Sequence, residues 1–510
     1  MTVTTNPTDI RMNSAPTVPR LDRCCSQELL HYFQDAWALE DKLLSSLAEP
    51  ATFYLRPDSL RNPLIFYLGH SAVFYVNKLV RVGLWPQRLN PNYEQLFEIG
   101  VDPNTSAELD AVINGIQWPE VGAVWDYRDR VKCTIEQIIQ TADFELPIHP
   151  KHPLWALLMA IEHQRIHIET SSMLLRQLSL DQLRCPADWS IAPTDLPAPE
   201  NFMRLIPGGT ITLGKSPTDQ TYGWDSEYGQ RQVEVPSFWA SQFLITNQEY
   251  QEFVAAGGYQ NAAYWSVEGW QWREAHQVSH PRFWIPQGDH YRYRSTFFEC
   301  DLPLAWPAEV NYYEAIAFCR WKGKGARLLS EAEWNRALQW SATEAKTTTQ
   351  SHDFRPWNQQ ADPHFNRPLV KGFDQDFDQD LDQTFGQDFG QAFGQDSDPI
   401  AELPPNLHWQ WISPRAVNSN RAIVQGLADL RGNVWEWIAD AFNPLPGFEP
   451  HPLYEDQSAP FFDEDHRMML GGSWATNGSM ALPSYRNWFR PHFYQHVGFR
   501  IAQGTSDLCN

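Results

Sequence analysis

Hydrophobic residues between positions 26 and 183 recur every three or four positions, which is the period of an amphipathic helix. Four long segments carry this pattern, over residues 29–47, 64–80, 121–139 and 154–178. Proline-rich breaks such as Arg56-Pro57 and Ile148-His149-Pro150 separate them. Helices of this length predict an up-and-down four-helix bundle with one long connection, over residues 82–120.

The pattern changes after Cys185. Four prolines within residues 186–199 indicate an interdomain linker. Beyond it, short strand patterns at 209–214 and 233–239 and short helical patterns at 246–255 and 312–322 lie among many Gly, Pro and Trp residues. This texture is typical of a loop-rich α+β domain. We therefore expect a disordered N-terminus over residues 1–24, a bundle over 25–185, a linker over 186–200 and a second domain over 201–505.

Residues 373–396 are six tandem tetrapeptides of the form Phe/Leu-Asp/Gly-Gln-X. Alternating Asp, Gln and Gly cannot build a hydrophobic core, and a period of four is too short for a solenoid repeat. The segment contributes seven aspartates, so calcium binding is one interpretation. Its composition favours the other, a tolerated disordered insertion.

Charge narrows the classes of partner. The chain has 39 Lys and Arg against 62 Asp and Glu, a net charge of −23, which disfavours nucleic acid and anionic membrane surfaces. The longest apolar run, residues 154–161, is far short of the ~20 residues that cross a bilayer, and the N-terminus lacks the apolar core of a signal peptide. We expect a soluble cytoplasmic protein. Its seven scattered cysteines, with no CxxC pair, suggest reduced thiols.

His163 and His167 are four residues apart, so both imidazoles project from one side of the same helix. Small and apolar residues share that side. The charged residues gather elsewhere on the helix: Glu162, Arg165, Glu169 and Arg176. An inward pair of imidazoles is costly to bury unless it is hydrogen-bonded or binds a metal ion, and the spacing alone permits either interpretation.

His70 lies in a second, otherwise apolar helical segment. A lone histidine there is usually a hydrogen-bonded core residue. An inward His on one bundle helix and an inward pair on another can also converge on a single ion. Three neutral nitrogen ligands suit Fe(II) oxygen chemistry or a zinc hydrolase, and the ligand type alone does not separate these.

Near the C-terminus, residues 485–494 combine cations and aromatic rings. Arg490 is a candidate clamp for a carboxylate, and Asn487 is a candidate to orient an amine or imidazole. An aromatic scaffold with incidental arginines is the alternative. Earlier in this half, residues 327–334 predict a helix start with a capping box of Ser330 and Glu333, and residues 429–437 predict a glycine turn followed by an aromatic strand.

The chain resembles the sulfoxide synthases of thiol-histidine biosynthesis in motifs that occur in family order between about residues 25 and 503. They are YLGHSAVFYVNKL, EHQRIHIETSSMLLRQL, PGG, RLLSEAEW, GNVWEW, GGSW and GFR. The resemblance implies a DinB-like four-helix bundle followed by a loop-rich domain similar to formylglycine-generating enzymes and C-type lectins.

Within this family the chain most resembles the 5-histidylcysteine sulfoxide synthases of ovothiol biosynthesis, through EHQRIHIETSS, residues 222–229 and RNWFRPHFYQHVGFR. Ergothioneine-forming relatives tend to have Gln where this chain has Ile166, and Asp where it has Phe489. Many ovothiol enzymes continue into a methyltransferase domain. Because this chain stops at Asn510, methylation is expected to need a separate protein.

The resemblance implies that His70, His163 and His167 hold Fe(II) and that O₂ is a co-substrate. The sulfur of cysteine would be coupled to the imidazole ring of histidine. Arg128 and Arg490 are then candidates for substrate carboxylates, and Asn487, Trp488 and His492 for the pocket wall. A nearby tyrosine is expected as proton donor, although the sequence does not identify it.

Three alternatives remain open at this stage. One is the same chemistry on trimethylhistidine, or with selenium in place of sulfur. Another is a zinc-dependent DinB-like thiol transferase or hydrolase. The last is a lectin-like binding protein with a vestigial bundle, for which His70→Ala and His163→Ala would leave function intact.

Overall fold

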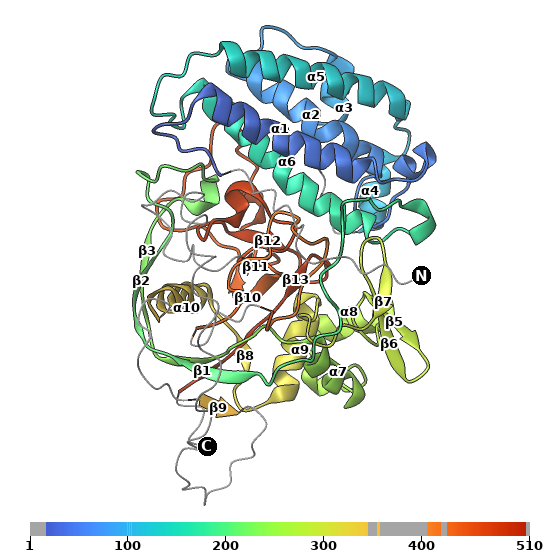
Figure 1. The fold of residues 1–510 in the computed structure, drawn as a ribbon, viewed down its shortest axis with the longest axis vertical. Coiled ribbons are helices and arrows are strands. Elements are labelled where there is room, and N and C mark those ends of the chain that lie inside the picture. Colours follow the sequence, from blue (N-terminus) through green and yellow to red (C-terminus); the bar gives the residue numbers. More distant parts are fainter. Residues whose placement is uncertain are drawn as a thin grey trace, which may run out of the picture.

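The structure is a computed structural model that describes residues 17–98, 100, 102–103, 105–344, 354–356, 405–419 and 426–505. A helical part built from the first third of the chain packs on a mixed part of short strands and helices (Figure 1). The repeat at 373–396 lies outside the described residues.

Four long helices form the helical part, and all four lie close to the predicted segments. They are α1 (Ser26–Leu44), α2 (Leu64–Arg81), α5 (Val121–Thr141) and α6 (Pro153–Leu175). Helices α1 and α2 each pack against both α5 and α6. The shorter helices η1 (Pro50–Tyr54), α3 (Pro91–Leu96), α4 (Ser106–Ile113) and η2 (Leu180–Gln182) lie in the connections. The long connection at 82–120 therefore contains two helices of its own.

Helix α6 is the element that joins the two parts, because it lies on the side of the bundle that faces the mixed part (Figure 1). It begins at Pro153, and the His152 side chain caps it by accepting a hydrogen bond from the Leu154 amide. Buried residues occur all around the helix, including Glu162, Arg165 and Glu169. Its charged side faces the mixed part rather than water.

The largest sheet of the mixed part has five strands in the order β8-β14-β4-β1-β9, and each neighbouring pair is antiparallel. Its strands are β1 (Phe202–Ile206), β4 (Phe238–Ser241), β8 (Arg327–Leu328), β9 (Phe354–Pro356) and β14 (Ile501–Gly504). A separate two-stranded sheet pairs β2 (Gly209–Leu213) with β3 (Arg231–Val235).

The single strand expected over residues 233–239 is wrong. Pro236 separates β3 from β4, and these two strands belong to different sheets. Proline has no amide hydrogen for a strand ladder, so it ends β3 and frees the chain to change sheets.

The remaining strands and helices complete this part. A four-stranded sheet contains β10 (Trp435–Ala441), β11 (Arg467–Leu470), β12 (Asn487–Phe489) and β13 (Val497–Gly498), and a three-stranded sheet contains β5 (Trp284–Gln287), β6 (His290–Arg294) and β7 (Glu299–Asp301). The α-helices of this part are α7 (Asn247–Ala255), α8 (Val267–His276), α9 (Tyr312–Lys322) and α10 (Glu331–Glu344). Its short helical turns are η3 (Asp225–Glu227), η4 (Ala262–Tyr264), η5 (Ala459–Phe461) and η6 (Gly478–Ala481). The predicted capping box starts α10: the Ser330 amide donates to the Glu333 carboxylate at 2.9 Å and the Glu333 amide donates to Ser330 Oγ at 3.2 Å.

Residues 17–24 are ordered, which corrects the expectation of disorder up to residue 24. Leu21 and Cys24 are buried. The Leu21 amide donates to the Gln220 carbonyl, and the Leu21 carbonyl accepts from the Ile148 amide, both at 2.8 Å. An apolar side chain with two paired backbone groups fixes this stretch between the two parts of the molecule.

The expected linker, residues 186–200, contains no helix or strand, and the domain boundaries stay predictions. It lies against the mixed part, where the Ala192 amide donates to Ser413 Oγ at 2.9 Å. Within the described ranges, no helix has both the length and the apolar character required to cross a bilayer.

Candidate metal centre

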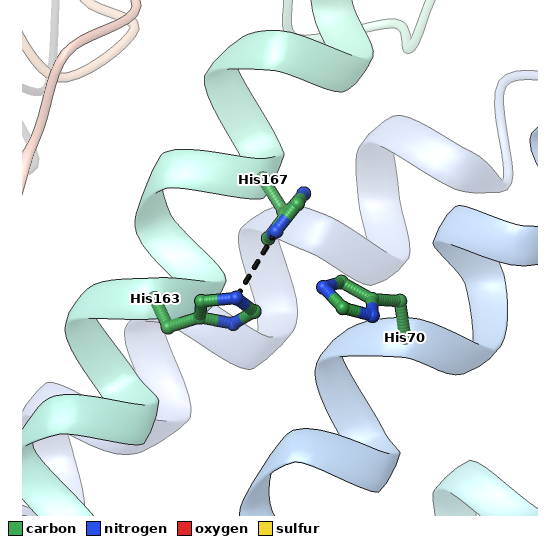
Figure 2. Close-up of side chains that lie close together, drawn as sticks. All are labelled: His70, His163 and His167. Atoms are coloured by element: carbon green, nitrogen blue, oxygen red, sulfur yellow. Dashed lines mark hydrogen bonds between the residues drawn. The ribbon is translucent and has the colours of Figure 1, made fainter. Parts of the chain in front are cut away.

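Three histidines from two helices converge between α2 and α6. His70 projects from α2, and His163 and His167 project from successive turns of α6 (Figure 2). The ring centroid of His70 lies 5.0 Å from that of His163 and 4.5 Å from that of His167, and the two α6 rings lie 4.4 Å apart. One ring nitrogen from each histidine lies within 4.8 Å of the other two. The structure thus brings together the three residues that the sequence predicts.

Burial keeps these imidazoles neutral. His70 and His163 are 3% and 2% exposed, and His167 is half-buried at the edge of the cluster. Loss of hydration lowers the pKa of His70 to about 4. Loss of hydration together with the neighbouring histidines lowers the pKa of His163 and His167 well below the usual value. A neutral imidazole offers a lone pair, which is the form that binds a metal ion.

The arrangement of the nitrogens fits one metal ion. The Nε2 atoms of His163 and His167 are 3.2 Å apart. Two nitrogens that each lie about 2.1 Å from one ion, at roughly a right angle, have this separation. The Nδ1 atoms of both residues are buried without a hydrogen-bond partner among the described residues. Three nitrogen ligands leave further coordination positions open.

Aromatic rings enclose the cluster. Phe74 stacks on His163 with ring centroids 3.6 Å apart and planes 7° from parallel, and Phe66 stacks on His70 at 4.7 Å. Two tyrosines lie at its edge: Tyr454, with its ring 5.9 Å from His163, and Tyr67, with its ring 6.1 Å from His167. Apolar walls lower the local dielectric and limit access of water, which strengthens polar interactions within the cluster.

Tyr454 comes from the mixed part of the chain, and two cations of α2 hold its segment in place. Lys78 Nζ donates to the Leu453 carbonyl at 2.6 Å, and Arg81 Nη2 donates to the Pro452 carbonyl at 2.7 Å. The Lys78 ammonium also lies 4.4 Å from the centre of the Tyr454 ring, within cation–π range. Burial lowers the pKa of Lys78 to about 8. The cluster therefore lies at the seam between the two parts.

The opposite side of α6 is bonded to the mixed part. Glu169 accepts hydrogen bonds from Trp435 Nε1 at 2.7 Å and from Thr476 Oγ1 at 2.8 Å. Two turns earlier, Glu162 accepts from the Ser479 amide at 2.9 Å, and one turn later Ser172 is bonded to His496 at 2.8 Å. These bonds fix α6, and with it both of its histidines, against the second half of the chain.

Arg128 does not serve the role expected from the sequence. Its guanidinium is fully buried within the bundle and donates to Glu40 at 2.9 Å, to Asp41 at 2.6 Å and to the Leu68 carbonyl at 2.9 Å. Two carboxylates of the same chain neutralise it, so a substrate carboxylate would have to displace them. Arg128 instead ties α5 to α1 and α2.

The four C-terminal candidates lie in or just after β12. Trp488 stacks on Phe442 at 4.2 Å, within the core of the mixed part, and Asn487 Oδ1 accepts from the Trp488 amide. Arg490 donates to Asp102 at 2.9 and 3.1 Å. No hydrogen bond, ion pair or ring contact in the described chain joins any of these residues, or His492, to the three histidines.

The charge of Arg61 acts on one residue of the predicted pocket wall and on one of the three histidines. Arg61 lies over the Phe493 ring at 4.3 Å. Burial and the charge of Arg490 lower the pKa of His492 to about 4, and Arg61 adds to this effect. Arg61 also contributes, after burial and His70, to the lowered pKa of His167.

Sequence reasoning missed Tyr454, Lys78 and Phe97, which all take part in this site. Phe97 acts through its backbone carbonyl, which accepts a hydrogen bond from His70 Nδ1 at 2.6 Å. Backbone groups leave no signature in a sequence. Lys78 has one: it lies eight residues after His70, on the same side of α2.

Known proteins match most of this chain. Residues 192–505 match the family model described as sulfatase-modifying factor enzyme 1-like domain. Hercynine oxygenase of Mycobacterium tuberculosis is 31% identical over 68% of this chain and 70% of its own length. Hercynine oxygenase of Mycolicibacterium thermoresistibile is 28% identical over 87% of this chain and 88% of its own length. Ergothioneine biosynthesis protein 1 of Neurospora crassa is 24% identical over 92% of this chain, which spans 56% of that protein.

Proposed function

Because the chain belongs to the sulfoxide synthase family of oxidoreductases, we propose that it is a non-haem iron(II) enzyme that uses O₂ to join the sulfur of L-cysteine to the imidazole ring of L-histidine. The product would be 5-histidylcysteine sulfoxide. The observation that carries the proposal is the convergence of His70, His163 and His167 at the seam between the two parts. We further propose that the bundle is DinB-like.

The reaction balances without another reductant. The thiol loses one hydrogen, the ring carbon loses one hydrogen, and a carbon–sulfur bond forms between them. One atom of O₂ ends on sulfur, and the other leaves as water with the two hydrogens. Four electrons pass from the two substrates to O₂, which is the full oxidising capacity of the molecule.

His70, His163 and His167 would hold the iron, and the bound ion would supply open positions at which a thiolate and O₂ can react. The chain's own groups would do the rest. The stacked rings of Phe66 and Phe74 keep water from the histidines. Burial raises the pKa of Tyr454 above its usual range, so its phenol keeps a proton at neutral pH and can donate it.

A second candidate has support for the substrate whose imidazole ring accepts the sulfur. Relatives in this family are named hercynine oxygenases, which favours a trimethylated histidine. Ile166 and Phe489, at the two positions where ergothioneine-forming relatives tend to have Gln and Asp, support free histidine. We therefore propose free histidine as the better acceptor and trimethylhistidine as the competitor.

The test uses the full chain loaded with iron(II) under nitrogen and then exposed to O₂ with cysteine and either acceptor. We expect O₂ uptake and a product with the mass of the histidine conjugate. This product should form in a larger amount than the trimethylhistidine conjugate. His163→Ala should abolish both signals, whereas the exposed control His149→Ala should retain them. A larger amount of the trimethylhistidine conjugate would show that trimethylhistidine is the better acceptor. Turnover of a thiol substrate by a zinc-loaded sample without O₂ would overturn the oxygenase assignment.

A further inference from the structure

We propose that Gly69 and Phe97 are positioning residues for the metal centre: together they hold His70 in the one tautomer whose free nitrogen faces His163 and His167. This inference rests on the proposed function, because it concerns how the chain prepares a ligand for the ion. It assigns a role to the long connection between α2 and α5, which is otherwise a linker within the bundle.

The hydrogen bond between His70 and Phe97 determines the tautomer. A backbone carbonyl can only accept, so the 2.6 Å contact requires the proton to be on His70 Nδ1. His70 Nε2 then carries the lone pair. The other two histidines have no such restraint, because their Nδ1 atoms lack a partner among the described residues. His70 is therefore the ligand whose protonation pattern the fold sets in advance.

Gly69 allows the Phe97 ring to approach α2. A Cβ atom built at Gly69 would lie 2.6 Å from two carbons of that ring, closer than real Cβ atoms come to any neighbour. The ring itself is fully buried, and Tyr93 and Trp118 pack against it with centroids 5.7 and 5.9 Å away. Glycine within a helix costs about 1 kcal/mol relative to alanine. Here it makes room for the residue whose carbonyl reaches the next side chain, His70.

A buried carboxylate fixes the segment that carries Phe97. Glu94 is fully buried in α3 and accepts hydrogen bonds from the Leu89 and Asn90 amides, each at 2.7 Å. Asn77, two turns after His70 on α2, donates to the Glu94 carbonyl at 2.9 Å. Residues 89–97 are thus attached to the same helix whose histidine they orient. The carbonyl of Phe97 is held at a fixed distance from His70 before any metal binds.

The test compares iron(II) affinities of full-length variants, measured without O₂ by competition with a chelator. In Gly69→Ala the new methyl group must push the Phe97 ring away, and the carbonyl moves with it. We expect affinity to fall about 10- to 100-fold, the usual loss when an outer partner of a histidine ligand is removed. Gly122→Ala is the matched control, because a Cβ at this helical glycine of α5 meets nothing within 4 Å. Its affinity should equal that of the wild type.

The double variant Gly69→Ala/Phe97→Ala removes the clash and keeps the backbone carbonyl. It should regain most of the affinity lost in Gly69→Ala. Failure to regain any of it, or an unchanged affinity in Gly69→Ala, would overturn the inference.

Nitrogen NMR of the metal-free wild type gives a readout that needs no variant. We expect the His70 ring to carry its proton on Nδ1, and a ring protonated on Nε2 would sink the inference even if Gly69→Ala fails to fold. A wild-type chain that binds no iron would contradict the proposed function instead, so the two failures are distinguishable.

Discussion

Tyr454 brings a phenol from the mixed part of the chain to the edge of the three-histidine cluster. Burial raises the pKa of this phenol above its usual range, so it stays protonated at the pH of a cell. Tyr67, whose ring lies 6.1 Å from His167, has its pKa raised to about 12 by burial. Both phenols therefore keep their protons at neutral pH.

We expect Tyr454→Phe to lower turnover about 100-fold, the range for loss of a general acid, and to leave iron(II) affinity unchanged. Tyr67→Phe, at the other tyrosine on the edge of the cluster, is the comparison and should retain more turnover. Steady-state O₂ uptake and metal titration of both variants measure this. A larger loss in Tyr67→Phe would transfer the proposed role to Tyr67.

Glu314, far from the histidines, predicts a pH dependence of stability. It is fully buried and accepts from Tyr259 Oη at 2.6 Å, and burial raises its pKa from 4.5 to about 7. The folded chain therefore keeps a proton that the unfolded chain releases between these pH values. Its contribution to stability is complete below pH 4.5 and is lost as the pH rises through 7.

Glu314→Gln replaces the protonated acid by a neutral amide of the same shape. We expect the variant to gain stability relative to the wild type as the pH rises from 5 to 8, by on the order of 3 kcal/mol. Denaturant unfolding at several pH values measures the difference. A difference that does not change with pH would show that Glu314 is ionised in the folded protein.

At the scale of elements, the long helices could be predicted because their hydrophobic period repeats over four or five turns. The period also gave the inward side of α6, and so placed His163 and His167 together. In short strands the hydrophobic pattern repeats too few times to be reliable. One proline divided the strand expected at 233–239. Tyr454 lies in a stretch with neither helix nor strand, where no periodicity tells which way a side chain points.

The contact between α2 and the segment 451–454 positions Tyr454 at the cluster. Lys78 and Arg81 bond two successive carbonyls of that segment, and Tyr454 follows directly. We expect Lys78→Met to lower turnover about 10-fold, because loss of a charged hydrogen bond loosens the segment. Lys78→Arg should retain more activity, since it keeps a donor. Turnover, KM and iron affinity separate the effects, and a loss confined to iron affinity would contradict this role for Lys78.

At the scale of the whole molecule, the charged side of α6 reads from the sequence like a solvent face. The structure buries it against the second half of the chain, which the sequence could not indicate because the partners lie about 130 to 320 residues away. The clearest pair is Arg176 with Glu309, at 2.7 and 2.9 Å and 2% exposed on both sides.

We expect Arg176→Met to destabilise the protein by about 3–5 kcal/mol, because it leaves a buried carboxylate without its cation. Arg184→Met is the control. Its pair with Glu49, at 3.5 Å, is more than 70% exposed, so the loss should stay below about 1 kcal/mol. Denaturant unfolding followed by tryptophan fluorescence measures both. Equal losses of stability in the two variants would show that the buried ion pair at the seam contributes no more than the exposed pair.

Helix α6 carries two of the three histidines and also bonds to the mixed part, and these two roles together fix its length. The histidines on one side and the bonded residues on the other share a single helical register from Glu162 to Arg176. Inserting one residue after His167 would turn everything downstream by about 100° and carry Ser172 and Arg176 away from His496 and Glu309. Side chains along this stretch can be exchanged one by one, but adding or deleting a single residue would uncouple the two histidines of α6 from the contacts that follow them.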